Sequence, residues 1–326
     1  MTPAGLGLWA AITIAVAGPA TSPEYLPLYV ARSEGYFAQE KLEVTLTTAR
    51  SEADAAETMA RGHADIAATS LDAAFRVGHS RGALPRIFFG LTAAPPVAIL
   101  VSSGPNAVRS PGDLRGQSVG LPGVGTPEQA MLSTILARAG VKIHAVPLRS
   151  FSNRALAGAL ETGQVAAAVM ADPWVTRLAD EKLANILVDL RSRSDAERWL
   201  GAVTVHAALF LRADTGVSEQ DLVGLARALL RAAARVSDTP AETLAAGLPA
   251  SVIGQPGDFA LRVSGARESY LPGGRVTEKM LKASLTQARE RAELPAAVKL
   301  PWFGVSSLLL TGPLDRATAG EQAPTR

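Results

Sequence analysis

Short apolar runs alternate with amphipathic stretches along most of this chain, which is the pattern of alternating strands and helices. Apolar residues form runs or occupy every second position in the strands, and they recur at intervals of three and four in the helices. The predicted strands cover residues 12–17, 42–47, 64–68, 87–91, 97–101, 118–122, 165–170 and 203–211. The predicted helices cover residues 24–34, 51–61, 70–78, 126–139, 153–162, 173–180, 218–236, 240–247, 258–270 and 277–292.

The alternation is interrupted and then resumes, and it becomes mostly helical after residue 211. This interruption predicts an α/β protein with two lobes, between which the chain crosses near residues 92–98 and 202–207. The final residues are polar and contain Gly and Pro, so we expect them to be loose. The predicted parts are a first lobe of residues 12–92 plus 207–300, a second lobe of 98–202, and a loose tail of 311–326.

The N-terminus has two interpretations. Residues 2–23 carry no charge, and such an apolar segment resembles the hydrophobic core of a secretory signal. A signal also needs a positive residue near its start, however, and the first Lys or Arg is Arg32. We therefore expect residues 12–17 to form the first buried strand, with residues 1–11 as an extension or a signal remnant.

A glycine-rich turn separates an apolar strand from a well-defined helix start. Thr126 occupies the N-cap position, Pro127 suits the first helical position, and Gln129 is placed to complete a capping box. Because Gly123 and Gly125 precede this cap, backbone N–H groups at the helix start are accessible and attract anions. The alternative is that the turn only connects the strand to the helix. Its glycine spacing is not that of a dinucleotide-binding loop.

A second strand, at 165–170, is followed by an acid and a large aromatic residue, Asp172 and Trp174, on either side of Pro173. The C-terminal ends of strands are where ligands bind in open α/β sheets, so both residues are candidate ligand contacts. The alternative is structural: the acid caps the next helix and the ring packs against it.

Hydroxyl-bearing residues follow two other strands. Thr69 and Ser70 come after the third predicted strand, where they suit an N-cap or a hydrogen bond to a ligand. Thr21, Ser22 and Tyr25 lie in the loop after the first strand. We expect these five residues to approach a ligand from the lobe opposite the glycine turn.

Composition narrows the possible chemistry. The chain is 48% hydrophobic and 19% charged with a net charge of +2, which suits a globular protein and not a nucleic-acid-binding one. It contains no cysteine, which excludes disulfides, thiolate nucleophiles and Cys-ligated metal centres. The four histidines lack the spacing of a metal site. Ser118 sits in a nucleophile-elbow string but begins a strand instead of ending one, which argues against a hydrolase.

Several segments resemble, in order, a family of ABC-transporter solute-binding proteins. The family is the sulfonate, taurine, nitrate and thiamine-precursor branch, with the type II periplasmic-binding-protein fold. Two departures are Lys41, where the family usually has Gly, and Ala166, where it usually has Asp. The segments are residues 26–40 (LPLYVARSEGYFAQE), 62–67 (GHADIA), 110–120 (SPGDLRGQSVG), 159–165 (ALETGQV) and 172–174 (DPW).

This resemblance implies a monomeric periplasmic protein that needs no cofactor or metal. It would hold a small anion or a heterocycle in a cleft between its lobes and deliver it to an ABC permease and its ATPase. An enzyme on the same fold and a ligand-sensing module are the alternatives, although the related enzymes that use cysteines are not matched here. The implied ligand contacts are Thr21, Ser22, Tyr25, Thr69, Ser70, Gly123, Gly125, Thr126, Asp172 and Trp174.

Overall fold

A five-stranded sheet forms the centre of the first lobe, and its strands come from two distant parts of the sequence. The computed structural model describes residues 9–103, 108–123, 126–290 and 304–321. The strand order is β2-β1-β3-β10-β4, in which β1 runs parallel to β2 and β3, and β10 runs antiparallel to β3 and β4. The strands are β1 (Ala10–Ala17), β2 (Leu42–Ala49), β3 (Ile66–Ser70), β4 (Arg86–Thr92) and β10 (Ala207–Leu211).

The second lobe has a sheet of the same design. Its order is β7-β6-β8-β5-β9, with β6 parallel to β7 and β8, and β5 antiparallel to β8 and β9. In each sheet the antiparallel strand at the fourth position is the first one that follows a crossing of the chain between lobes. The strands are β5 (Val97–Ser102), β6 (Val119–Leu121), β7 (Leu148–Ser150), β8 (Ala167–Ala171) and β9 (Ala184–Asp189).

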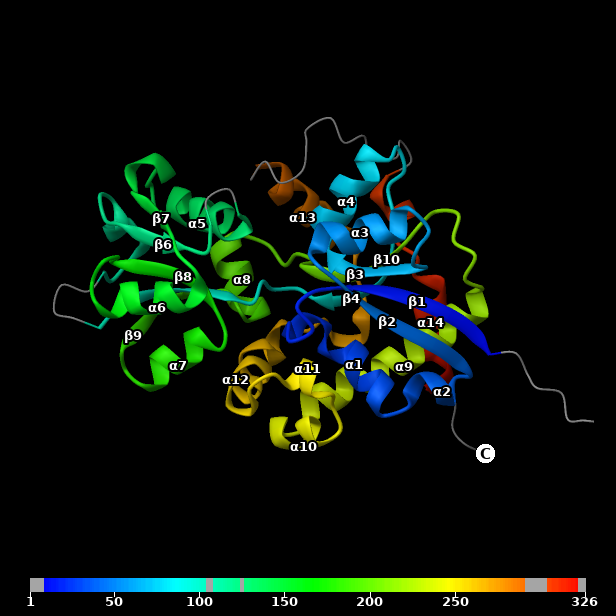
Figure 1. Cartoon of the computed structure of the whole chain (residues 1–326). Coiled ribbons are helices and arrows are strands. Elements are labelled where there is room, and N and C mark those ends of the chain that lie inside the picture. The colour runs from blue at the N-terminus through cyan, green and yellow to red at the C-terminus, as the bar shows by residue number, and fades with distance from the viewer. Residues whose placement is uncertain (1–8, 104–107, 124–125, 291–303, 322–326) are drawn as a thin grey trace, which may run out of the picture.

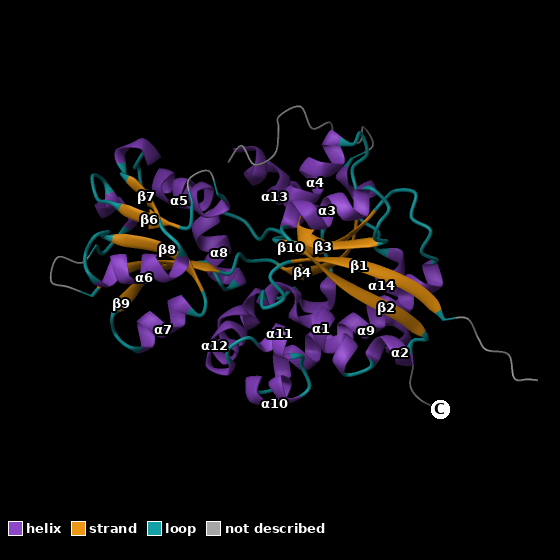
Figure 2. Cartoon of the chain, viewed as in Figure 1, coloured by secondary structure: helices purple, strands orange, loops and turns teal. Residues whose placement is uncertain are grey.

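Helices cover both faces of each sheet (Figures 1 and 2). The first lobe contains α1 (Leu26–Ser33), α2 (Tyr36–Gln39), α3 (Glu52–Ala60), α4 (Leu71–Ser80), α9 (Glu219–Asp238), α10 (Ala241–Ala246), α11 (Ala250–Ile253), α12 (Pro256–Ala266), α13 (Glu278–Glu290) and α14 (Gly312–Glu321). The second contains α5 (Pro127–Arg138), α6 (Asn153–Glu161), α7 (Trp174–Asp180) and α8 (Arg193–Leu200). Short 3-10 helices are η1 (Pro23–Tyr25), η2 (Pro111–Leu114), η3 (Ile143–Ala145), η4 (Arg267–Ser269), η5 (Pro272–Gly274) and η6 (Val305–Leu308).

The strand residues alternate between two apolar layers because successive side chains of a strand point to opposite faces. In β10, Leu209 packs in the layer that contains α1 and α9, whereas Phe210 packs in the layer that contains α4 and α13. In β5, Ile99 faces α5 and Leu100 faces α6 and α7. Both sheets are therefore buried on both faces, which explains why their central strands are mostly apolar.

The two crossings between the lobes are tied together at the first sheet. The backbone N–H of His206 donates to the carbonyl of Thr92 at 2.9 Å, and the N–H of Ala207 donates to the Thr92 hydroxyl at 3.3 Å. At the second sheet, the N–H of Leu190 donates to the carbonyl of Val97 at 3.1 Å. These bonds keep the crossings short. The predicted lobe boundaries stay a prediction.

The structure corrects the sequence interpretation at both ends of the chain. Ala10 and Ala11 belong to β1, where they pair with Leu42 and Glu43, so they are not part of an extension. Residues 312–321 form α14 and not a loose tail, and α14 packs on α9 through a buried Leu314. A proline in the first turn is compatible with a helix, and the sequence interpretation gave Gly and Pro too much weight here.

Five further strands and α-helices are absent from the sequence prediction, namely α2, β7, β9, α8 and α11. β7 has three half-buried or exposed residues, and β9 alternates irregularly between buried and exposed positions, so neither has an apolar pattern that marks a strand. No helix in the described part of the chain combines the length and hydrophobicity of a membrane span.

A substitution in α14 tests the correction at the C-terminus. Leu314 is 2% exposed, so Leu314→Ala should lower the free energy of unfolding by about 2–5 kcal/mol through lost burial and a residual cavity. A loose tail would give no change. Arg316→Ala is the control on the same helix, because its pair with Glu219 is exposed and such pairs contribute about 0–1 kcal/mol. Urea unfolding of the full chain measures both.

Candidate functional site

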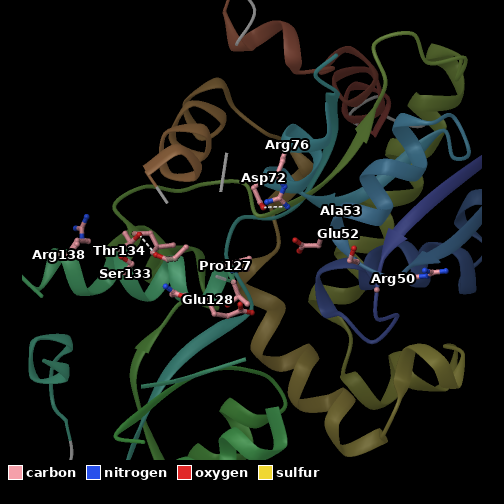
Figure 3. A pocket seen from close by; sticks show the side chains of 17 residues that line it. Arg50, Glu52, Ala53, Asp72, Arg76, Pro127, Glu128, Ser133, Thr134 and Arg138 are labelled. Carbon is pink, nitrogen blue, oxygen red and sulfur yellow. Dashed lines mark hydrogen bonds and ion pairs between the residues drawn. The ribbon is translucent and has the colours of Figure 1, made fainter. Parts of the chain in front are cut away.

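Two cavities lie where the lobes face each other, and they adjoin at the Gly18–Pro19 turn after β1. The larger, about 1250 Å³, lies between α3 and α4 of the first lobe and α5 of the second (Figure 3). The smaller, about 270 Å³, lies between the loop after β1, the end of β8 and α12. We call them the α5 cavity and the α12 cavity. Both are lined by residues that follow the C-terminal ends of strands, which is where such folds bind ligands.

The hydroxyls of Thr69 and Ser70 both hold Glu52 in place. Thr69 Oγ1 donates to the backbone carbonyl of Glu52 at 2.8 Å, and Ser70 Oγ donates to Glu52 Oε2 at 2.6 Å. Both hydroxyl residues are buried at the end of β3. They therefore position an acid at the wall of the α5 cavity, and in this conformation their protons are not directed to a ligand.

Glu52 is the first residue of α3 and has an unusual electrostatic environment. Burial, and after it the neighbouring carboxylates of Asp72 and Glu128, raise the pKa of its carboxyl to about 7, although the hydrogen bond from Ser70 and the charge of Arg76 act in the opposite direction. Glu52 is therefore partly protonated near neutral pH. A positive group in the cavity would favour its ionised form.

Tyr25 lies beside the same acids. It is 3% exposed, and burial, followed by the charges of Glu52 and Glu24, raises its pKa well above the usual value. Glu24 Oε1 lies 4.0 Å from Nε2 of His206. Burial raises the pKa of Glu24, and His206 opposes this shift. The loop after β1 therefore adds a second buried acid to the region between the lobes.

Thr126, which follows the glycine turn, starts a helix as the sequence predicts, but the hydrogen bond of its side chain differs from the prediction. Thr126 is the N-cap of α5 and lines the α5 cavity. Its hydroxyl donates to the carbonyl of Gly123 at 2.9 Å and makes no capping bond, so the predicted capping box with Gln129 is wrong. Gly125 lies outside the described residues, so the predicted anion contact of this turn stays a prediction.

Asp172 lines the α12 cavity together with Thr21 and Ser22, but its charge is already satisfied within the protein. Its carboxylate accepts hydrogen bonds from Arg191 Nη1 at 2.6 Å and from the backbone N–H of Thr176 at 2.9 Å. The Asp172 side chain is only 5% exposed. Of the two interpretations of this acid, the structural one describes its contacts.

Helix α12 of the first lobe approaches Asp172 so closely that its facing residue is glycine. A Cβ atom on Gly265 would lie 1.9 Å from Asp172 Oδ2, a distance that no side chain tolerates. Nearby, Arg177 of α7 forms an ion pair with Asp258 of α12 and stacks on Trp174, with its guanidinium carbon 5.2 Å from the ring centre. Trp174 thus packs at a contact between the lobes.

Sequence reasoning missed the acids of the α5 cavity. Glu52, Asp72 and Glu128 each stand in the first turn of a helix, where acids are common because they neutralise the helix dipole. That ordinary pattern gave no sign that the three helix starts meet. Arg191 was missed because its partner Asp172 lies 19 residues away, beyond any local pattern.

Removing the Asp172 carboxylate should destabilise the second lobe. Asp172→Ala leaves the Thr176 N–H without its acceptor and weakens the ion pair of Arg191, so the free energy of unfolding should fall by about 2 kcal/mol, as for other buried groups left unpaired. Asp180→Ala, at an exposed position of α7, is the control and should change the free energy of unfolding by less than about 0.5 kcal/mol. Thermal unfolding of both variants is the measurement, and equal stability would contradict the structural role.

The shift at Glu52 predicts a pH-dependent stability. The folded state holds the Glu52 proton more tightly than the unfolded state, so this stabilisation is complete below about pH 4.5 and is lost as pH rises through about 7. Glu52→Gln retains an acceptor for Ser70 and cannot ionise. The free energy of unfolding of Glu52→Gln, relative to that of wild type, should rise by about 3 kcal/mol between pH 4.5 and pH 9. Glu43→Gln, on the exposed side of β2, is the control. Its free energy of unfolding should differ from that of wild type by the same amount across this pH range.

A comparison with family models and solved structures places the chain. A protein from Bordetella bronchiseptica RB50 has a TM-score of 0.71 at 22% identity, over 96% of this chain and 98% of that one. The alkanesulfonate-binding protein SsuA from Xanthomonas axonopodis pv. citri, bound to MOPS, has a TM-score of 0.64 at 18% identity, over 92% and 98%. The periplasmic nitrate-binding protein NrtA from Synechocystis PCC 6803 has a TM-score of 0.65 at 11% identity, over 97% and 90%.

These likenesses confirm the predicted two-lobed periplasmic-binding-protein fold. No curated protein sequence matches the chain. A family model described as NMT1/THI5 like matches residues 22–243, which is more than half of the chain and agrees with the predicted relationship. The chain therefore belongs to the NMT1/THI5-like family.

Proposed function

We propose that this protein is the solute-binding component of an ABC import system and that it captures a small solute between its lobes. The observation that carries the proposal is the α5 cavity, which α3 and α4 line from one lobe and α5 lines from the other. A solute bound there would contact both lobes, and its binding energy would favour the state in which they are closed. The volume of the α5 cavity exceeds what a small solute needs, as expected for an open cleft.

The placement of the contacts between the lobes supports closure from one side. On the α12 side the lobes already meet through the pair Arg177–Asp258 and through Arg193 Nε, which donates to the carbonyl of Glu268 at 3.2 Å. The α5 cavity lies on the other side of the Gly18–Pro19 turn. We infer that the lobes rotate about the crossings and the α12 contacts, so that α5 approaches α3.

The proposed setting follows from the structural neighbours. The names of two of them describe binding proteins for an alkanesulfonate and for nitrate, and one is described as periplasmic. We propose the periplasm as the location, a membrane permease with its ATPase as partners, and binding without chemical conversion as the activity. The absence of cysteine is consistent with this, because it removes the thiol on which some enzymes of this fold depend.

Filling the α5 cavity tests the proposal. Ala130 lines the cavity in the second turn of α5, so Ala130→Trp should abolish stabilisation by any solute that wild type binds. Ala139→Trp, at the exposed C-terminal end of the same helix, is the control and should retain it. The measurement is a thermal-shift screen of small anions, amines and heterocycles, in which a solute at 100 times its Kd adds about 2.7 kcal/mol of stability.

Mass spectrometry of the bound solute then separates binding from catalysis. A binding protein returns the solute unchanged after prolonged incubation. Conversion of the solute, at a rate that Ala130→Trp abolishes, would contradict the proposal in favour of an enzyme on this fold. Solute-induced stabilisation that survives in Ala130→Trp would place the site elsewhere.

A further inference from the structure

We propose that Asp258 acts as a switch at the contact between the lobes, because it can pair with either of two arginines. Arg177 lies across the boundary in the second lobe, and Arg262 lies one turn further along the same helix, α12. Pairing with Arg177 joins the lobes at this edge, and pairing with Arg262 releases them. The switch goes beyond the proposed function, because it concerns how the empty protein moves, whatever its solute.

Three residues of α12 form the stripe that faces the second lobe. Asp258, Arg262 and Gly265 are separated by four and by three positions, so they share one face of the helix. Gly265 lies against the Asp172 carboxylate of the second lobe, and Asp258 forms an ion pair with Arg177 of α7. Arg262 is therefore in the middle of this stripe, and it lines the α12 cavity.

Arg262 carries the charge that the contact between the lobes leaves unmatched. It is 8% exposed, and its Nη2 donates to the backbone carbonyl of Ile253 at 2.7 Å. Within the described ranges of the chain, no carboxylate forms an ion pair with it. Burial lowers the pKa of Arg262, and the charges of Asp258 and, after it, of Asp172 oppose this shift. A buried cation without an acid is costly, so Arg262 favours a conformation that brings an acid to it.

Of the acids near Arg262, Asp258 is the one that can move to it. Asp172 is held by Arg191 Nη1 at 2.6 Å, and its side chain is 5% exposed. Glu24 also lines the α12 cavity, but its carboxylate lies 4.0 Å from the imidazole at the second crossing. The Asp258 side chain is 25% exposed, which leaves room for a change of rotamer.

The other partner, Arg177, has a second interaction of its own. Its guanidinium carbon lies 5.2 Å from the centre of the Trp174 ring, so it keeps a favourable contact after Asp258 leaves. On a helix, an acid four residues before an arginine is well placed to pair with it, as Asp258 is before Arg262. In the released state each charge therefore has a partner, and Arg262 gains one.

This exchange keeps the two states of the contact close in free energy. Forming the contact gains the pair with Arg177 but leaves Arg262 without an acid, and releasing the contact reverses both effects. The apparent affinity of a protein falls with the fraction of molecules that are competent to bind. Asp258 would thus determine how much of the empty protein has the α12 contact about which the lobes close.

Distances between spin labels in the solute-free protein test the switch. The chain has no cysteine, so Glu181→Cys after α7 and Glu242→Cys on α10 provide two exposed label sites without background. Figure 1 shows α12 between these two helices, so the distance between the labels increases when the lobes part. The labelled wild type should show two populations. Arg262→Met should lower the longer-distance population at least threefold, because Asp258 loses its alternative partner, and Arg177→Met should lower the shorter-distance population at least threefold.

Two variants are the controls for this experiment. Arg154→Met removes an exposed arginine of α6 and should leave both populations unchanged. Arg262→Lys keeps a cation that Asp258 can reach, so it should retain the longer-distance population. A single population in the labelled wild type, or an unchanged ratio of populations in Arg262→Met, would overturn the proposal.

A crystal structure of Arg177→Met gives a second test, which does not depend on whether Arg262→Met folds. The Asp258 carboxylate should then lie within ion-pair distance of the Arg262 guanidinium. A carboxylate that points to solvent or to another cation would contradict the exchange of partners. Because neither experiment contains a solute, their failure would leave the solute-binding function intact.

Discussion

The hydrogen bond between the two crossings of the chain is the constraint on which the rest of the molecule depends. The His206 N–H donates to the Thr92 carbonyl at the point where one segment leaves the first sheet and the other returns to it. Both crossings are anchored there, and residues that follow the C-terminal ends of β1, β3, β6 and β8 line the two cavities between the lobes. Each feature of the candidate site follows from this placement.

Much of the fold could be predicted from the sequence because its central elements are strongly periodic. β8 and β10 are apolar throughout, β5 is apolar up to its last residue, and α5 and α9 have clear start signals at Thr126 and Ser218. The peripheral elements could not be predicted, because their residues are determined by neighbours and not by local pattern. β7 exposes most of its three residues, and α14 depends on packing against α9, which no local rule reveals.

The site could be predicted only in part, for a related reason. Strand ends identify which loops meet, and Thr21, Ser22, Thr126 and Asp172 do line cavities between the lobes. Local sequence does not show how charges are balanced. Asp172 has its counter-charge in Arg191, whereas Glu52 is held by hydroxyls that cannot neutralise it. The fold is shared with binding proteins for anions, but a fold does not determine its ligand, and these charges are the features that distinguish the chain.

The contact at Gly265 has a mechanical consequence. Because Gly265 has no side chain, α12 lies against the Asp172 carboxylate, and this edge of the molecule has no room for a Cβ atom. This contact would block closure by translation of one lobe toward the other, so the closure that we propose is a rotation about that edge. In such a rotation of the second lobe about its contact with α12, the displacement of a residue increases with its distance from α12. The start of α5 lines the other cavity, so a rotation about α12 would change the separation of Glu128 from the first lobe.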